Sequence, residues 1–128
     1  MRVMAGPSFD IPARPRRRYP YSGGVEYEGE TVFTLTPSED HTDESLTQLV
    51  EVVVGGSYTY GDWFDLPMPL FLVRDDETGD VFRVAVRDGT VELHVLPATE
   101  SAGLRRFYDR LVEESDTSWS VECRVDAP

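Results

Sequence analysis

The stretch that decides the fold is VFRVAVRDGTVELHV, residues 81–95. Apolar and polar residues alternate on both sides of Asp88-Gly89, and such a pair between two alternating runs is a strong signal for a hairpin with a type I′ turn. A two-residue loop places Arg87 opposite Thr90 and sets the register of every pair beyond them. One face of the hairpin is then entirely apolar and belongs to the core. Its members are Phe82, Val84, Val86, Val91, Leu93 and Val95.

Alternating runs elsewhere predict the remaining strands, and two segments have the 3.6-residue spacing of helices. The predicted strands are 31–35, 70–74, 81–87, 91–96 and 119–125. The segment 104–112 is a helix with arginine–carboxylate pairs at i, i+4 on its outer side. The segment 46–54 also has helical spacing, but its valines leave a strand over 49–54 as the alternative.

These elements predict the fold class. Their order is β-α-β-β-β-α-β, which indicates an α+β two-layer sandwich. We expect a largely antiparallel sheet of about five strands with two helices on one face.

Charge and proline content divide the chain into two unequal parts. Residues 1–24 hold five arginines against Asp10, a balance of 5 − 1 = +4, so residues 25–128 carry −12 − 4 = −16. Four prolines in the first part are expected to break any helix or ladder. The sequence therefore predicts an extended Arg/Pro-rich arm over 1–24 and a single α+β domain over 25–128.

The overall composition indicates a habitat more clearly than a task. The chain has no lysine or asparagine, and twelve arginines face twenty-four Asp and Glu. Such a surface repels itself unless salt screens it, and at molar salt the Debye length is about 3 Å. We interpret the chain as a salt-adapted cytoplasmic protein; the alternative is an ordinary acidic protein encoded in GC-rich DNA. No apolar stretch is long enough to cross a membrane.

Catalytic chemistry has little support. His94, Arg83 and Glu92 share the polar face of the hairpin and form the hypothetical site of a small-molecule enzyme. The alternative is that Glu92 offsets Arg83 and Arg87 across the sheet. The acidic stretch 75–80 lacks the ligand spacing of a calcium loop and is interpreted as a hairpin turn.

Other single residues add no chemistry to this picture. His41 lies in an acidic loop that is expected to cap a helix, and Cys123 is expected to be a buried, unreactive residue. We assign no catalytic residue, metal or cofactor.

Two segments are candidates for binding. The first is aromatic, and either lines a ligand cleft or protein interface or folds over an open edge of the core. Its candidate residues are Tyr58, Tyr60, Trp63, Phe64 and Met68. The second is the arm, with Arg14, Arg16, Arg17 and Arg18. Because binding to phosphates weakens steeply with salt, we favour docking of the arm onto the acidic body of its own chain, or onto an acidic neighbour of the same protein, over nucleic acid.

The resulting functional hypothesis is a binding or regulatory protein that contacts a protein partner or its own copy. The alternatives are a nucleic-acid-associated regulator that uses the arm, and a small-molecule-binding domain or enzyme with its site on the outer sheet face.

Overall fold

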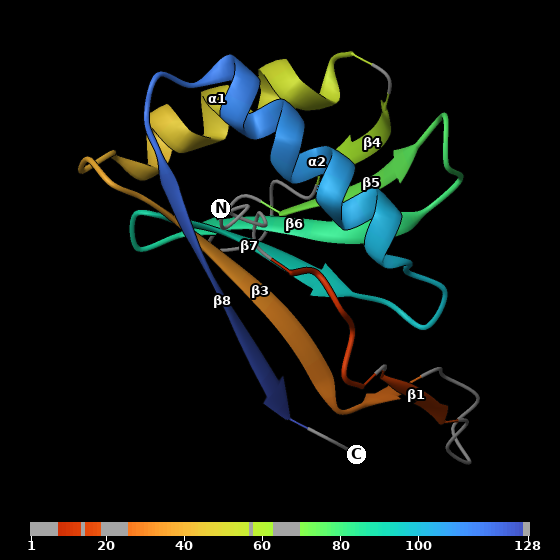
Figure 1. Cartoon of the computed structure of the whole chain (residues 1–128). Coiled ribbons are helices and arrows are strands. Elements are labelled where there is room, and N and C mark those ends of the chain that lie inside the picture. The colour runs from red at the N-terminus through yellow and green to blue at the C-terminus, as the bar shows by residue number, and fades with distance from the viewer. Residues whose placement is uncertain (1–7, 14, 19–25, 57, 63–69, 127–128) are drawn as a thin grey trace, which may run out of the picture.

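The computed structural model describes residues 8–13, 15–18, 26–56, 58–62 and 70–126. Two helices cover one face of a six-stranded antiparallel sheet with the strand order β4-β5-β6-β7-β3-β8 (Figure 1). The sheet strands are β3 (Glu30–Pro37), β4 (Tyr58–Asp62), β5 (Leu70–Asp75), β6 (Val81–Arg87), β7 (Thr90–Val95) and β8 (Trp119–Asp126). The helices are α1 (Asp43–Val54) and α2 (Ser101–Glu114). A separate two-stranded ladder joins β1 (Arg16–Arg18) and β2 (Glu26–Glu28).

The predicted α+β two-layer fold and its element order are confirmed. The β6–β7 hairpin has the expected register. Arg87 lies opposite Thr90, and the pairs continue as predicted to Phe82 opposite Val95. Asp88 and Gly89 both have positive φ, 52° and 74°, as a type I′ turn requires. The sheet also has a strand that was not predicted, β4, which pairs with β5 at one edge.

The segment 46–54, for which the sequence allowed either a helix or a strand, belongs to the helix α1. Thr42 caps it by accepting a 3.0 Å hydrogen bond from the Ser45 backbone N–H, which satisfies a donor that the first turn leaves free. Leu46, Val50, Val53 and Val54 on the apolar side of the helix are fully buried, and Leu49 is partly buried. Tertiary packing therefore outweighs the preference of valine for strands.

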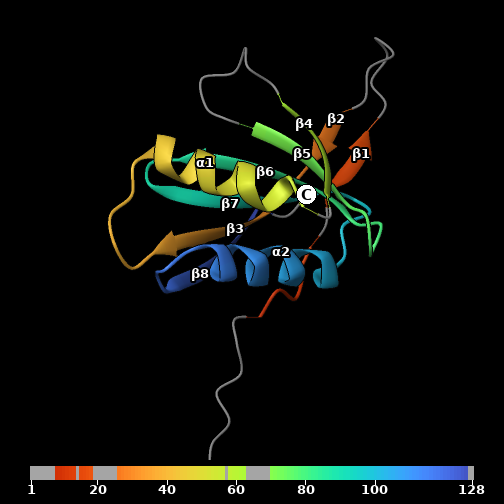
Figure 2. The same cartoon turned by 90° about the horizontal axis from the view of Figure 1, so that it is seen from above.

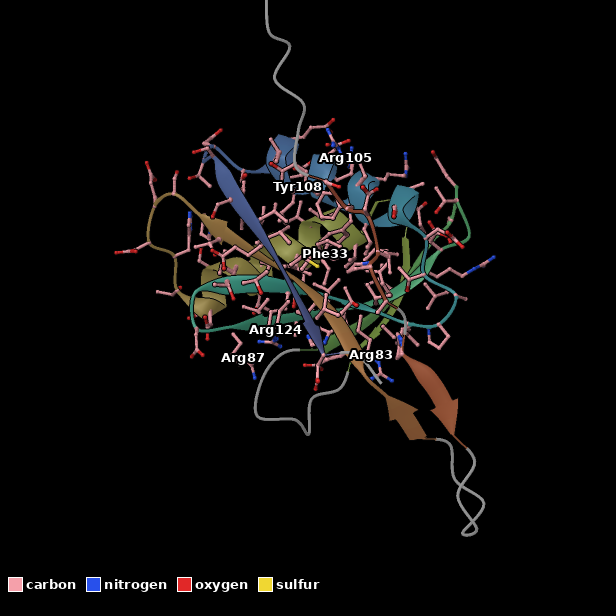
Figure 3. All side chains as sticks on the ribbon, turned by 60° about the horizontal axis from the view of Figure 1, so that its bottom comes forward. Phe33, Arg83, Arg87, Arg105, Tyr108 and Arg124 are labelled. Atoms are coloured by element: carbon pink, nitrogen blue, oxygen red, sulfur yellow. The ribbon has the colours of Figure 1, made fainter. Side chains whose placement is uncertain are left out.

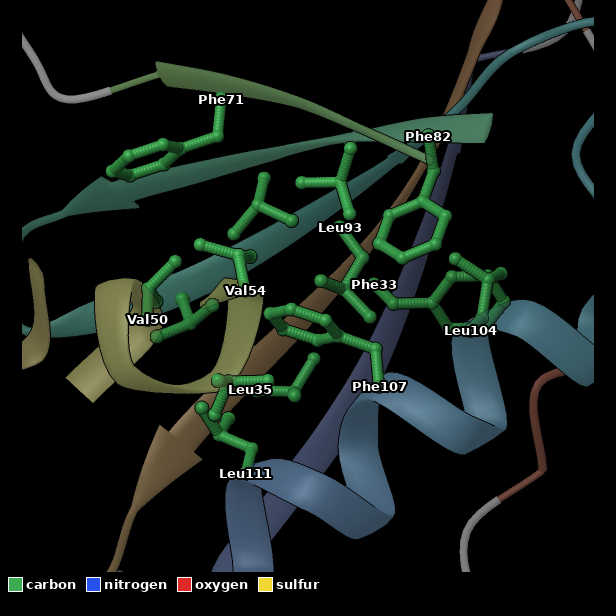
Figure 4. Packing of buried hydrophobic residues seen from close by; sticks show 14 of the residues in the cluster. Phe33, Leu35, Val50, Val54, Phe71, Phe82, Leu93, Leu104, Phe107 and Leu111 are labelled. Atoms are coloured by element: carbon green, nitrogen blue, oxygen red, sulfur yellow. The ribbon is translucent and has the colours of Figure 1, made fainter. Parts of the chain in front are cut away.

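The core lies between the helices and the sheet. Figure 4 shows Phe33, Phe82, Phe107 and Leu93 meeting in this layer. The rings of Phe82 and Phe107 pack edge to face with their centroids 5.6 Å apart. Seen from above, α1 lies over β6 and β7, and α2 lies beside it toward β8 (Figure 2). Neither helix of the described chain is long and apolar enough to cross a membrane.

Part of the predicted arm lies against the domain. Phe9 is only 4% exposed, and its ring packs on Phe33 and Tyr108 at centroid distances of 5.2 and 5.4 Å. The Thr31 hydroxyl donates a 2.6 Å hydrogen bond to the Ala13 carbonyl. The expectation that prolines break every ladder in this segment is wrong for Arg16–Arg18, because Pro15 precedes the strand and removes none of its donors. The division at residue 24 stays a prediction.

Candidate functional site

The outer face of the sheet, opposite the helices, carries a buried carboxylate that lies between an arginine and a histidine. The Glu92 side chain on β7 is only 7% exposed. One of its oxygens lies 3.1 Å from the Arg87 guanidinium, and the other lies 3.1 Å from His94 Nε2. Ala85 lies opposite Glu92 on β6, so a small side chain leaves space for the longer neighbours. Glu92 therefore offsets the charge of Arg87 across the sheet, as expected.

A pocket of about 190 Å³ opens beside this cluster. Its lining residues are Pro15, Gly29, Glu30, Thr31, Arg83, His94, Val95 and Leu96. Arg83 lies opposite His94 in the β6–β7 register, so the three residues of the hypothetical enzyme site are neighbours. The carboxylate of Glu92 orients the imidazole, and Arg83 adds a cation at the same pocket. This arrangement suits the binding of a small anion, and Glu30 offsets part of the positive charge.

The acidic stretch 75–80 is a turn between β5 and β6, as predicted. Asp75 Oδ1 accepts hydrogen bonds from the Glu77 and Thr78 backbone N–H groups, at 2.8 and 3.3 Å. Its other oxygen lies 3.0 Å from Arg106 Nε, and Glu77 lies 2.9 Å from the same guanidinium. The carboxylates thereby attach helix α2 to the turn. Within the described residues, no three His, Cys, Asp or Glu side chains are grouped so as to hold a metal ion.

The aromatic candidates fall partly on the edge strand β4. Tyr58 lies opposite Asp75 and Tyr60 opposite Val73 in the register of β4 and β5. Their alternation with Thr59 and Gly61 is the signal that would have predicted this strand. Trp63, Phe64 and Met68 lie outside the described residues. The assignment of this segment as a binding site stays a prediction.

The arginine candidates also lie partly within and partly outside the described residues. Arg14 lies outside the described residues. Arg16 and Arg18 lie opposite Glu28 and Glu26 in the β1–β2 register, with Arg17 between them. Opposite charges therefore occupy facing positions on this ladder. A role of these arginines in contacts with a partner stays a prediction.

The strand β8 forms the far edge of the sheet, a feature that the sequence analysis missed. All eight of its residues pair with β3, from Trp119 opposite Pro37 to Asp126 opposite Glu30. No other strand of the described chain pairs with its free side. Figure 1 shows β8 beginning near the C-terminal end of α2 and then running away from both helices. Trp119, whose indole donates a 2.9 Å hydrogen bond to Ser115, lies at the end near the helix.

From Glu122 onward, the side chains of β8 are exposed. Cys123 is exposed, so the expectation of a buried cysteine is wrong. The reason is that α2 does not reach this part of the strand. Partial desolvation still raises the pKa of the Cys123 thiol, which disfavours the reactive thiolate. Val125, two residues further, is 41% exposed.

No known protein family, curated protein or solved structure matches this chain.

Proposed function

We propose that this protein is a small binding or regulatory protein that acts through protein–protein contact, with β8 as its docking element. The observation that carries the proposal is the length and regularity of this edge. It offers eight residues in an uninterrupted register with β3. An edge of this kind presents unpaired N–H and C=O groups to which an extended segment of a partner can add as a further strand.

β8 has charged residues on its outer face but lacks three other devices that guard edge strands in monomeric proteins. It contains no proline, no bulge in its pairing with β3, and no charged side chain on the helix side. The sequence of β8 is WSVECRVD, and its helix-side positions are Trp119, Val121, Cys123 and Val125. Its charged residues Glu122 and Arg124 lie on the outer face, where Arg124 reaches Glu30 at 3.4 Å. Both members of that pair are about half exposed, so the pair contributes little stability.

We also propose that the protein is adapted to high salt and works in the cytoplasm. A formal net charge of −12 with no lysine is the supporting observation. In molar potassium chloride the repulsion between two such chains is screened, and apolar contacts and backbone hydrogen bonds persist. The backbone hydrogen bonds formed in strand addition do not depend on charge. Association is therefore expected at molar salt.

A labelled strand peptide tests the docking element. The probe is residues 118–126 with serine in place of Cys123, carrying a fluorophore, titrated with the full chain in 1 M potassium chloride. We expect a saturable rise in anisotropy with the wild-type chain. The variant Cys123→Lys with Val125→Lys should lose it, because inward lysines guard an edge.

A matched control keeps the added charge and moves it away from β8. Val52→Lys with Val112→Lys places two lysines at exposed valines of the helices, and this variant should bind the peptide as the wild type does. Equal binding by the β8 variant, or no binding by the wild type, would overturn the proposal.

A second candidate function is binding of a small anion at the outer face. The pocket beside Arg83 and His94 favours it. Inorganic phosphate is a suitable probe, followed by the NMR signals of the His94 ring. A shift that saturates in the wild type and is lost in Arg83→Gln would support this site, and a shift unchanged by that substitution would count against it.

The nucleic-acid alternative has less support. Acidic residues already lie opposite Arg16 and Arg18 in the β1–β2 register. A test by deletion of residues 1–24 would also remove Phe9 from the core. Replacement of Arg14, Arg16, Arg17 and Arg18 by glutamine is the cleaner variant, and loss of co-purified nucleic acid on that replacement would favour this alternative.

A further inference from the structure

We infer that the partner of β8 is a second copy of this chain. In this arrangement two β8 strands pair antiparallel about a two-fold axis beside Cys123, and the two sheets become one. The inference rests on the proposed function of β8 as a docking element. It adds the identity of the partner and the register of the pairing.

Symmetry limits the registers that two copies can adopt. In an antiparallel pair, directly opposite residues point to the same face of the sheet. A two-fold axis perpendicular to the sheet must therefore pass beside a residue that lies opposite itself. In the middle of β8 the residues available for this position are Val121, Glu122, Cys123 and Arg124.

Charge excludes two of these four registers. An axis beside Glu122 places that carboxylate opposite its own copy. An axis beside Arg124 places two guanidinium groups together and also places Glu122 opposite Asp126. Like charges directly opposite each other are destabilising. In a chain with a net charge of −12, no excess of positive charge nearby offsets the added carboxylate contacts.

The axis beside Cys123 is favoured over the one beside Val121. It places Glu122 of each copy opposite Arg124 of the other, so that two complementary pairs form. It also keeps residues 120–126 of both strands within the ladder. An axis beside Val121 retains only 119–123 and leaves Arg124 opposite residue 118, beyond the strand. Both charge and length therefore select Cys123.

The side chains on the helix side of β8 also favour the register with the axis beside Cys123. Val121 of one copy lies opposite Val125 of the other, and the two Cys123 side chains lie opposite each other. Val125 is among the most exposed large apolar residues of the described chain, and Cys123 is exposed as well. Cross-strand apolar pairs stabilise a sheet. The pairing therefore covers the part of β8 that α2 leaves open.

Disulfide formation in the full chain tests the register. Oxidation with diamide removes two electrons and two protons from a pair of thiols and leaves a disulfide and a hydrazine. The wild-type chain should cross-link through Cys123, at a pH high enough to offset the raised pKa of this thiol. Chains with Cys123→Ser plus either Val121→Cys or Val125→Cys should not cross-link alone, but an equal mixture of the two should.

Charge reversal in trans provides a second test that is independent of cysteine. Glu122→Arg alone and Arg124→Glu alone each place like charges opposite one another, and should weaken dimerisation about tenfold or more. A mixture of these two variants restores complementary pairs and should dimerise as the wild type does. Light scattering after gel filtration measures all three, in the lowest salt that keeps the chain folded.

The outcomes separate this inference from the proposed function. A wild-type chain that stays monomeric while the strand peptide still binds would overturn the inference and leave β8 as a docking element for another protein. A dimer in which Val121→Cys chains cross-link with themselves would overturn the register. If Cys123→Lys with Val125→Lys changes neither peptide binding nor dimerisation, both proposals are wrong.

Discussion

The two faces of the sheet bury side chains in different ways. On the helix side, Phe33, Phe82 and Leu93 are covered by apolar residues of both helices. On the outer side, Ala85 is almost completely buried, and Glu92 is held between Arg87 and His94. Figure 3 shows Arg83, Arg87 and Arg124 on that side. The inner face depends on shape and apolar area, whereas the outer face also depends on the pairing of charges.

The largest effect is expected on the inner face. Phe33→Ala removes a fully buried ring that packs on Phe9 and should lower the free energy of unfolding by about 3–5 kcal/mol. Urea denaturation in molar potassium chloride measures this value. Thr34→Ala, one residue along on the outer face, is the control and should change the stability far less. Equal losses would contradict the distinction between the faces.

A smaller loss is expected at the centre of the outer face. Glu92→Gln keeps the size of the side chain but removes the charge shared by Arg87 and His94. Because the carboxylate is almost completely buried, we expect a loss of about 1–3 kcal/mol. Asp109→Asn, which breaks the exposed pair with Arg105, is the matched control and should cost about 0.5 kcal/mol or less. Equal losses of unfolding free energy in the two variants would contradict this stabilising role of Glu92.

The smallest effect concerns a carboxylate that is buried against helix α2. Burial raises the pKa of Asp80 above its ordinary 3.8, although hydrogen bonds from the Gly103 backbone and Thr78 oppose the shift. The folded chain then binds this proton more tightly than the unfolded chain does. The contribution of Asp80 to stability is complete below pH 3.8 and is lost as pH rises through the pKa of the folded state.

The difference in unfolding free energy between the wild type and Asp80→Asn isolates this contribution. We expect the difference to fall over that pH interval and to stay constant above it. A difference that rises with pH would show that the hydrogen bonds, and not burial, control the pKa of Asp80.

Local chemistry was sufficient to predict the central hairpin and the helix α2, whereas for α1 it left a strand over 49–54 as the alternative. The turn Asp88-Gly89 defines one register, and its flanking alternation defines one apolar face. The strand β4 was missed because Gly61 and the run of aromatics around it obscure a five-residue alternation. Phe9 was assigned to an arm because its neighbours are prolines and arginines. Its burial depends on Phe33 and Tyr108, which are distant in the sequence.

The candidate sites were predictable to different extents. The cluster of Arg83, Glu92 and His94 followed from the hairpin register, because cross-strand neighbours are known once the turn is known. The pocket beside it was not predictable, since Pro15 and Glu30 come from other segments. The β8 edge was also missed, because alternation shows that a strand has two faces and does not show which strand lies beside it.

The sequence by itself determined the strands β3 and β5–β8, the helix α2, the hairpin register and the acidic surface, since these depend on residues close together in the chain or on composition alone. Only the tertiary structure decided that β8 lies at an edge, that α2 leaves Cys123 uncovered, and that Glu92 contacts both Arg87 and His94. Those features depend on the order of strands in the sheet and on the reach of one helix. Both are set by packing between segments that are distant in the sequence.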